Sequence, residues 1–453
     1  MMGPLTPDLC VIGAGAAGLS VAAGAAQMGA EVVLIERGLM GGDCLNFGCV
    51  PSKSLLAAAR LADLGRRGAA LRVASTPSRV DFAAAMDGVQ KVIATLAPKD
   101  SVERFERLGV RVVQAEARFT SPRTIHAGAT EIRPRRFIIA TGSHPAIPEI
   151  PGLDRIAYLT NETVFANREL PEHLIIVGGG PIGIEMAQAH CRLGSRVTVL
   201  DNGPVLPRDD PEVVAMLLER LAAEGIAIRP RIDIAAVDRG DAGIMVRLAD
   251  GERIVGSHLL VAAGRRPSIE ALDLPAAGIT ATGSGITVDA RLRTTNRRAF
   301  AIGDVAGGPQ FTHIALYQAG IVIRNALFRL PAKVDYRALP WTTYTDPELA
   351  QVGLTEPAAR AADRDVRVTR WPFVDNDRAQ TERDIEGIVK VVLRRGGRVV
   401  GASILGAGAG DLIVPWALAI SQNLKIGALA NLVVPYPTRS EASKRAAACY
   451  YTP

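Results

Sequence analysis

The stretch DLCVIGAGAAGLS, residues 8–20, decides the fold of this 453-residue chain. It begins as a short apolar run of the kind that forms a buried parallel strand, then passes through glycines into an Ala-rich segment typical of a helix. A second apolar run, EVVLIE at residues 31–36, ends on an acid. Strand, glycine turn, helix and strand in this order predict a β-α-β unit that binds a dinucleotide.

The same pattern recurs 165 residues further along the chain, where HLIIVGGG (residues 173–180) precedes RVTVLD (residues 196–201). In both copies the last glycine precedes the acid by 18 residues. One Gly-x-Gly-x-x-Gly pattern is weak evidence, but two copies in the same context indicate two dinucleotide sites. The glycines and acids are Gly13, Gly15, Gly18 and Glu36 in the first copy, and Gly178, Gly180, Gly183 and Asp201 in the second.

The residue types in this motif have physical reasons. The first glycine permits a tight turn, the second lets the backbone approach a pyrophosphate, and the third lets the helix pack closely on its strand. The helix N-terminus then presents free N–H groups and a positive dipole end to the phosphates. The acid accepts hydrogen bonds from ribose hydroxyls.

Other segments fit around these two units. RFIIATG (136–142), HLLVAAGRRP (258–267) and RAFAIGDV (298–305) each run from an apolar strand into a glycine turn. From Trp341 onward, strand-like runs at 387–395 and 398–405 and an apolar helix over 411–424 predict a separate α+β domain. The fold class expected is α/β, with two Rossmann-like domains and this C-terminal domain, and boundaries fall near Pro151, Leu272 and Pro340.

Charge and hydropathy exclude some functions. The net charge of +6 is spread along the chain without a basic block, so we expect no nucleic-acid partner. Residues 9–30 carry no charge and are long enough to span a bilayer, but their five glycines and the absence of a preceding basic segment favour a buried strand-turn-helix. We therefore expect a cytoplasmic protein with no membrane contact.

Two of the five cysteines stand out, Cys44 and Cys49 in GGDCLNFGCVPSK (residues 41–53). The set is odd and sparse, and no Cys-x-x-Cys occurs, so neither a secreted disulfide framework nor a structural metal site is expected. A pair beside a nucleotide-binding unit suggests a dithiol that cycles with a disulfide. The helix after Pro51 and the charge of Lys53 would both favour the Cys49 thiolate.

This segment resembles the redox-active motif of the class I pyridine nucleotide-disulfide oxidoreductases, the family of dihydrolipoamide dehydrogenase, glutathione reductase and mercuric reductase. The resemblance covers essentially the whole chain and implies an FAD-dependent enzyme that acts as a homodimer. The domains it implies are an FAD-binding domain in two parts (1–151 with the redox cysteines, and 273–340), an NAD(P)H-binding domain (152–272) and a dimerisation domain (341–453).

The resemblance also implies roles for individual residues. Cys44 would attack the acceptor, Cys49 would face the flavin, and Lys53 would lie beside the flavin paired with Glu185. Asp304, in AIGDV, would bind the ribityl chain. The cofactor-binding residues expected are Gly13, Gly15, Gly18, Glu36, Gly42, Lys53, Thr141, Gly142, Gly178, Gly180, Gly183, Asp201, Gly264 and Asp304.

The end of the second nucleotide unit, VTVLDNGPVLPR, bears on the nicotinamide cofactor. Asp201 favours a free ribose 2′-hydroxyl and repels a 2′-phosphate, and no Arg follows before Arg208. The sequence therefore predicts NADH rather than NADPH.

The chain departs from the family near its C-terminus. Dihydrolipoamide dehydrogenases and glutathione reductases carry a His-Pro-Thr…Glu motif whose His, from the partner subunit, is the acid/base for the thiols. Here the matching residues are Tyr436 and Glu441, and none of the six histidines lies beyond His313. A Tyr of pKa ~10 is a poor base at neutral pH, so efficient dihydrolipoamide oxidation is not expected.

Three functions remain open. The first is an NADH-dependent reductase of a small disulfide or similar thiol-reactive acceptor, with Tyr436 supplied by the partner subunit. The second is a mercuric-type metal-ion reductase, since mercuric reductases also have Tyr here, although they carry a C-terminal cysteine pair where this chain has only Cys449. The third is a dihydrolipoamide dehydrogenase-like flavoprotein that docks a lipoylated or thioredoxin-like partner.

Overall fold

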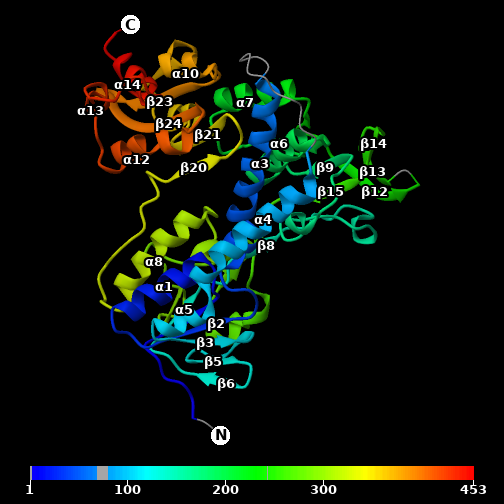
Figure 1. Cartoon of the computed structure of the whole chain (residues 1–453). Coiled ribbons are helices and arrows are strands. Elements are labelled where there is room, and N and C mark those ends of the chain that lie inside the picture. The colour runs from blue at the N-terminus through cyan, green and yellow to red at the C-terminus, as the bar shows by residue number, and fades with distance from the viewer. Residues whose placement is uncertain (1–2, 69–79, 242, 453) are drawn as a thin grey trace.

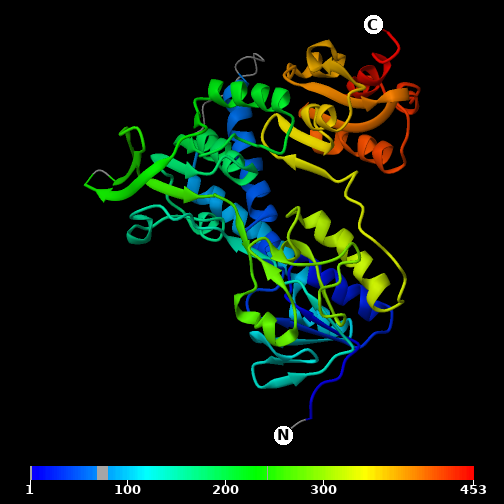
Figure 2. The same ribbon diagram turned by 180° about the vertical axis from the view of Figure 1, so that it is seen from behind.

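The computed structural model describes residues 3–68, 80–241 and 243–452, which form three bodies around one long helix (Figure 1). The N-terminal body lies at the bottom of the view, the body around residues 170–260 at the upper right, and the C-terminal body at the top. The long helix, α3 (Cys49–Arg67), runs from the first body up to the second. Seen from behind, the C-terminal body again stands apart above the first one (Figure 2).

The first body is built on a five-stranded parallel sheet. Its strands lie in the order β19 (Ala299–Ala301), β7 (Arg136–Ile139), β1 (Leu9–Ile12), β2 (Val32–Glu36) and β3 (Val110–Gln114). All four residues of β1 are buried, as expected for a parallel strand covered on both faces. Helices α1 (Ala16–Gln27) and α8 (Thr312–Ala326) pack against each other, so segments from both ends of the first 330 residues form one body.

The second body contains the repeat of this architecture. Its parallel sheet has the order β11 (Ala227–Arg229), β10 (Arg196–Leu200), β9 (His173–Val177) and β15 (His258–Val261). Helices α6 (Pro181–Leu193) and α7 (Pro211–Ala223) complete the β-α-β units. An antiparallel sheet, β12 (Ile234–Gly240), β13 (Gly243–Leu248) and β14 (Arg253–Gly256), extends from it. Both predicted β-α-β units are confirmed.

Smaller elements connect these bodies. β8 (Ser143–Pro145) pairs with β16 (Arg265–Pro267), which joins the end of one sheet to the end of the other. The remaining elements are α2 (Gly42–Asn46), α4 (Phe82–Leu96), α5 (Val102–Arg107), β4 (Ala117–Ser121), β5 (Thr124–Ala127), β6 (Thr130–Ile132), β17 (Ala281–Thr282) and β18 (Gly285–Ile286).

The C-terminal body is an antiparallel sheet with helices around it. The strands lie in the order β20 (Pro340–Thr343), β21 (Glu348–Gly353), β24 (Arg398–Gly406), β23 (Ile388–Arg394) and β22 (Val366–Pro372). The helices are α9 (Glu356–Ala362), α10 (Asp377–Glu382), α11 (Ala409–Leu412), α12 (Val414–Ser421), α13 (Gly427–Ala430) and α14 (Ser440–Ala448).

One prediction for this body is wrong: a single helix over 411–424 does not form. The segment is divided between α11 and α12, which begins with a proline in its first turn. A proline has no backbone N–H to donate to the preceding turn, so it suits a new helix start better than a helix interior. Trp416, on α12, is fully buried in the core of this body.

The uncharged run at residues 9–30 forms β1, a glycine turn and α1, as predicted. Within the described part of the chain, no helix has both the length and the apolar character needed to cross a bilayer.

Candidate active site

The two glycine motifs have matching geometry. Gly13 and Gly178 have φ angles of +102° and +115°, a region that strongly favours glycine. A Cβ at either position would overlap a carbonyl oxygen, that of Ala140 beside Gly13 and that of Ala262 beside Gly178. In each copy the first glycine therefore permits both the turn and the close approach of a neighbouring strand end.

The third glycine of each motif packs its helix against the turn. A Cβ at Gly18 would overlap the carbonyl oxygen of Gly13, and a Cβ at Gly183 would overlap that of Gly178. The second glycines are helix N-caps that offer no side-chain cap, so the N–H groups of the first turn remain open to an anion. This arrangement fits the phosphates of a bound dinucleotide.

The two acids hold their own loops. Glu36 accepts from the backbone N–H of Ala14 (2.6 Å), and Asp201 accepts from that of Gly179 (2.5 Å). The second oxygen of each acid accepts from a glycine N–H two residues further on, at 2.7 Å for Glu36 and 2.6 Å for Asp201. Each carboxylate is thereby fixed at the end of its strand, where the sequence places the ribose.

Both loops open into one cavity of about 1450 Å³. This exceeds the roughly 300–1,000 Å³ of a single small-molecule site, so there is room for two large cofactors. The predicted residues that line it are Gly13, Gly15, Glu36, Gly42, Cys44, Cys49, Lys53, Thr141, Gly142, Gly178, Gly180, Glu185, Asp201, Gly264 and Asp304. Gly18, Gly183, Tyr436 and Glu441 are not among its lining residues.

The two cysteines lie on successive helices at this cavity. Cys44 is on α2, and Cys49 is the first residue of α3, so it stands at the positive end of a 19-residue helix. Both thiols are free. The Cys49 Sγ lies 3.4 Å from the Thr312 Oγ1, at the start of α8. No feature of the sequence pointed to Thr312, because its segment is far from the cysteines along the chain.

The environment separates the acidities of the two thiols. The hydrogen bond from Cys44 lowers the pKa of Cys49 to about 6, and Thr312 and the charge of Lys53 act in the same direction against burial. The same hydrogen bond, together with burial, raises the pKa of Cys44 well above its ordinary range. The arrangement therefore favours a thiolate at Cys49 and a thiol at Cys44 that donates a hydrogen bond to it.

Lys53 lies one helical turn after Cys49 and forms an ion pair with Glu185, with 2.7 Å between Nζ and Oε2. The Glu185 carboxylate is buried, and its other oxygen accepts from the backbone N–H of Tyr344 (2.9 Å). The Lys53 ammonium also lies 4.5 Å from the centre of the Tyr344 ring. The structure thus brings together the lysine and glutamate that the resemblance pairs.

A second network of polar side chains contacts α2, the helix that carries Cys44. The Asp43 carboxylate accepts from Asn161 Nδ2 (2.9 Å) and lies 3.2 Å from Arg265 Nη2. Arg265 also donates to the Ser143 hydroxyl (2.7 Å), which donates to Asp304 (2.5 Å). Sequence reasoning missed this link, although Asp43 and Arg265 both stand inside motifs that it singled out.

Tyr436 and Glu441 belong to the C-terminal body and lie away from the cavity. Tyr436 is 72% exposed and donates to the Asp377 carboxylate (2.9 Å), which raises the pKa of the phenol. Glu441, in the first turn of α14, accepts from Arg445 (3.1 Å). Within one subunit these two residues are not part of the cysteine site.

Comparisons with known proteins agree with this geometry. Residues 7–319 match the pyridine nucleotide-disulphide oxidoreductase family, and residues 339–447 match its dimerisation domain. The chain is 38% identical to a mercuric reductase of Streptomyces lividans over 97% of this chain and 95% of that protein. It is 35% identical to a dihydrolipoyl dehydrogenase of Thermus scotoductus over 98% and 97% of the two chains.

Two solved structures have the same fold. LpdA from Mycobacterium tuberculosis superposes with a TM-score of 0.90 at 28% identity, covering 98% of this chain and 99% of that one. The Cu(II) complex of the HOCl-induced flavoprotein disulfide reductase RclA from Escherichia coli gives a TM-score of 0.88 at 28% identity, covering 96% and 98%. The dimerisation domain supports a homodimer, and the family uses FAD and NAD(P)H. The chain therefore belongs to the pyridine nucleotide-disulphide oxidoreductases, flavoenzymes that act on sulfur groups.

Proposed function

We propose that the chain is an NADH-dependent flavoprotein reductase that passes an electron pair through Cys44 and Cys49 to a disulfide or another thiol-reactive acceptor. One observation carries this proposal: the Cys49 thiolate, its protonated partner and the Lys53–Glu185 pair face the same cavity as both glycine loops. FAD and NADH supply the hydride and electron chemistry when bound. The chain supplies the loops, the thiols and their charges.

In the proposed reduction, the Cys44 thiol would pass its proton to the neighbouring Cys49 thiolate and attack the acceptor disulfide, which forms a mixed disulfide and releases the first acceptor thiolate. That thiolate would take the proton from Cys49, and Cys49 would then attack Cys44, re-forming the intramolecular disulfide as the second acceptor thiolate leaves. Overall, one disulfide takes up two electrons and two protons and becomes two thiols. A leaving thiolate needs a proton donor, and the partner subunit's Tyr436, whose pKa is raised by Asp377, can donate but is a poor base. Oxidation of a dithiol needs the opposite, so we expect lipoamide turnover to be weak.

We propose NADH as the reductant. The fixed Asp201 carboxylate directly follows β10 and would repel a 2′-phosphate but accept from a 2′-hydroxyl. No basic side chain, which a 2′-phosphate would need, follows Asp201 directly. The next arginine along the chain, Arg208, lines the cavity seven residues further on.

A metal-ion reductase is the second candidate. Relatives named mercuric reductase and the Cu(II) complex of RclA support it, as does the tyrosine in place of histidine. The C-terminal thiol relay would be incomplete, because Cys449, just after α14, has no neighbouring cysteine. A thiophilic ion would have to reach Cys44 with at most one helper thiol.

The test is anaerobic NADH oxidation by wild type, Cys44→Ser and a control, Cys191→Ser, which removes a cysteine outside the pair. The acceptors are lipoamide, glutathione disulfide, other small disulfides, thiol-complexed Hg(II) and Cu(II). We expect a disulfide to be turned over by wild type and by the control but not by Cys44→Ser. Turnover of a metal ion alone would favour the second candidate. Wild-type rates that survive Cys44→Ser would contradict both, and silence on every acceptor would favour a protein-docking role.

A further inference from the structure

Three segments of the chain contact one another at two places, first at Glu185, which lines the cavity, and again at Asp346. They are α3, α6 and residues 344–346, which connect β20 to β21. At the first meeting Lys53, Glu185 and the Tyr344 N–H are joined. One oxygen of the Glu185 carboxylate pairs with Lys53, and the other accepts from the Tyr344 N–H. Because the Tyr344 backbone orients the carboxylate, the position of Lys53 depends on where that backbone is held.

Gln188 fixes that backbone from α6. Its Oε1 accepts from the Asp346 N–H (2.8 Å), and its Nε2 donates to the Asp346 carbonyl (2.8 Å). The side-chain amide therefore pairs with both backbone groups of one residue, as a neighbouring strand would. Gln188 is only 1% exposed, so water does not compete for these bonds.

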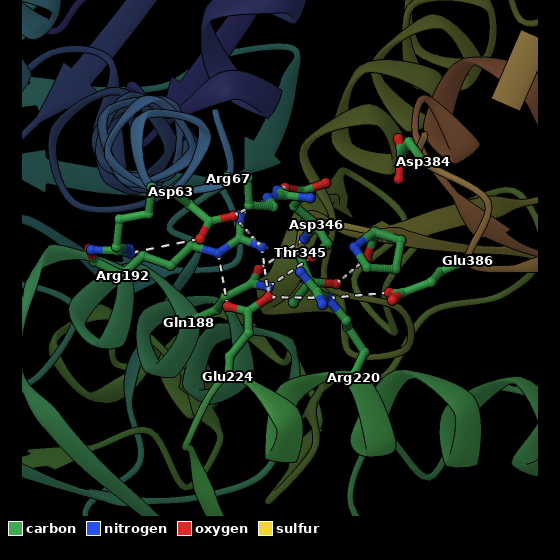
Figure 3. A network of polar contacts seen from close by, with 12 residues as sticks. Asp63, Arg67, Gln188, Arg192, Arg220, Glu224, Thr345, Asp346, Asp384 and Glu386 are labelled. Atoms are coloured by element: carbon green, nitrogen blue, oxygen red, sulfur yellow. Dashed lines mark hydrogen bonds and ion pairs between the residues drawn. The ribbon is translucent and has the colours of Figure 1, made fainter. Parts of the chain in front are cut away.

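Arg192 holds the same residue by its charge. Its Nη1 lies 2.7 Å from the Asp346 carboxylate, and its Nη2 donates to the Asp346 carbonyl (3.0 Å). Glu224 accepts from the other side of the guanidinium at 2.6 and 2.8 Å. Figure 3 shows Gln188 and Arg192, both from α6, together with Asp346 and with Glu224, which follows α7. Arg192 is 3% exposed, which makes each of these ion pairs costly to break.

The third segment, α3, enters the same network. Arg67 donates to the Asp346 carboxylate (2.8 Å) and pairs with Asp63 one turn earlier (2.5 Å). The helix that starts at Cys49 and carries Lys53 is thus attached to Asp346 near its other end. Along α6, Glu185, Gln188 and Arg192 follow the i, i+3, i+7 spacing that places side chains on one helix face.

We propose that Gln188 and Arg192 are positioning residues: by fixing the Asp346 backbone they hold Tyr344 against Glu185, and so keep the Lys53 ammonium in place beside Cys49. This proposal rests on the proposed function, because it assigns Lys53 to the redox site. The network continues from Glu224 through Arg220 to Glu386 in the C-terminal body, so a purely structural role as an interdomain lock is the competing explanation.

The test uses the FAD-loaded dimer with Gln188→Met, which keeps the side-chain volume and removes both hydrogen bonds to Asp346 and a third to the Glu224 carboxylate (3.1 Å). In a Cys44→Ser background, the ultraviolet absorbance of the Cys49 thiolate is titrated with pH. We expect its midpoint to rise by about 0.5 unit, because a displaced Lys53 stabilises the thiolate less. In the Cys44-containing enzyme, NADH-dependent reduction of the cysteine pair should slow about fivefold. Arg192→Lys, which keeps the charge and loses the planar fork, should show the same shifts in smaller measure.

Arg370→Gln is the matched control. It breaks an ion pair of 2.7 Å with Glu212 that also joins the second body to the C-terminal body, but it touches none of the three segments. An interdomain lock predicts a loss of thermal stability in both variants and no change in the thiolate midpoint in either. Unchanged midpoints and reduction rates in Gln188→Met and Arg192→Lys would overturn the proposal. A wild-type enzyme whose cysteine pair is not reduced by NADH would instead overturn the proposed function.

Discussion

Asp43 stands directly before a redox cysteine, and its carboxylate lies 3.2 Å from the Arg265 guanidinium. Arg265 follows the strand that closes the second nucleotide-binding sheet, so this contact ties α2 to a distant part of the chain. The Asp43 charge opposes ionisation of both thiols. Arg265 and Asn161 hold it in place at the edge of the cavity.

Replacing Asp43 by Asn in the Cys44→Ser background should lower the pKa of Cys49 relative to the same background with Asp43, whose charge raises that pKa. A negative charge near a thiol disfavours the thiolate, so its removal moves the pKa down. Titration of the thiolate absorbance in the Cys44→Ser background measures the shift. Asp43→Glu keeps the charge and serves as control; a rise of the midpoint in Asp43→Asn would contradict the prediction.

The wild-type enzyme should lose its Cys49 thiolate as the pH falls through about 6. The pKa is lowered from an ordinary value of 9.0, so the charged form is present above about pH 6 and protonated below it. Alkylation of Cys49 in the reduced wild-type protein, distinguished from alkylation of Cys44 by peptide fragmentation in the mass spectrometer, should follow this titration. A midpoint near the ordinary value would show that the hydrogen bond from Cys44, Thr312 and Lys53 have little influence.

Tyr436→His should raise dihydrolipoamide oxidation by about 10–100-fold, since it supplies a base that titrates near neutrality. Tyr436→Phe should not raise it. Steady-state NAD⁺ reduction with dihydrolipoamide measures both variants. Equal activity of His and Phe at this position would mean that residue 436 does not reach the thiols of the partner subunit.

Asp201→Asn should reduce the preference for NADH over NADPH by about tenfold, because it removes a charge that repels a 2′-phosphate and nearly keeps the side-chain shape. The ratio of kcat/KM for the two nucleotides is the measurement. Asp209→Asn removes a carboxylate from the same loop and is the control. A wild-type enzyme that favours NADPH would already refute the assignment.

Lys390→Met should destabilise the protein by about 3–5 kcal/mol. Lys390 is 2% exposed and forms an ion pair with Asp210 (2.8 Å), which is fully buried and would keep only its backbone hydrogen bonds without this cation. Arg370→Gln, which removes an exposed partner of the neighbouring Glu212, should cost no more than about 1 kcal/mol. Denaturant midpoints of the two variants give the comparison, and similar midpoints would exclude a special role for the buried lysine.

The nucleotide-binding units could be predicted because their turns require glycine at fixed positions, and this requirement is visible in the sequence. Gly13 and Gly178 occupy backbone conformations that strongly favour glycine, and their spacing from Glu36 and Asp201 follows from the length of a helix between two strands. The cysteine pair was predictable for the same reason, as a local motif.

The partners of these motifs were not predictable. Thr312, Asn161 and Tyr344 reach the site from segments more than 100 residues away from Cys49, and only the packing of the bodies brings them there. The single helix predicted over 411–424 is divided for a local reason: the prediction followed the apolar pattern and gave no weight to Pro415, which lies in the first turn of α12. The roles of individual site residues stay predictions, and so do the domain limits at Pro151, Leu272 and Pro340.

Tyr436 and Asp377 lie on a different body from the cavity that holds the cysteines. A substitution at either residue therefore leaves the side chains that line the cavity of its own subunit unchanged. Under the proposed role of Tyr436, the choice of acceptor and the transfer of electrons would be separable properties of the chain, and each could be altered by mutation without the other.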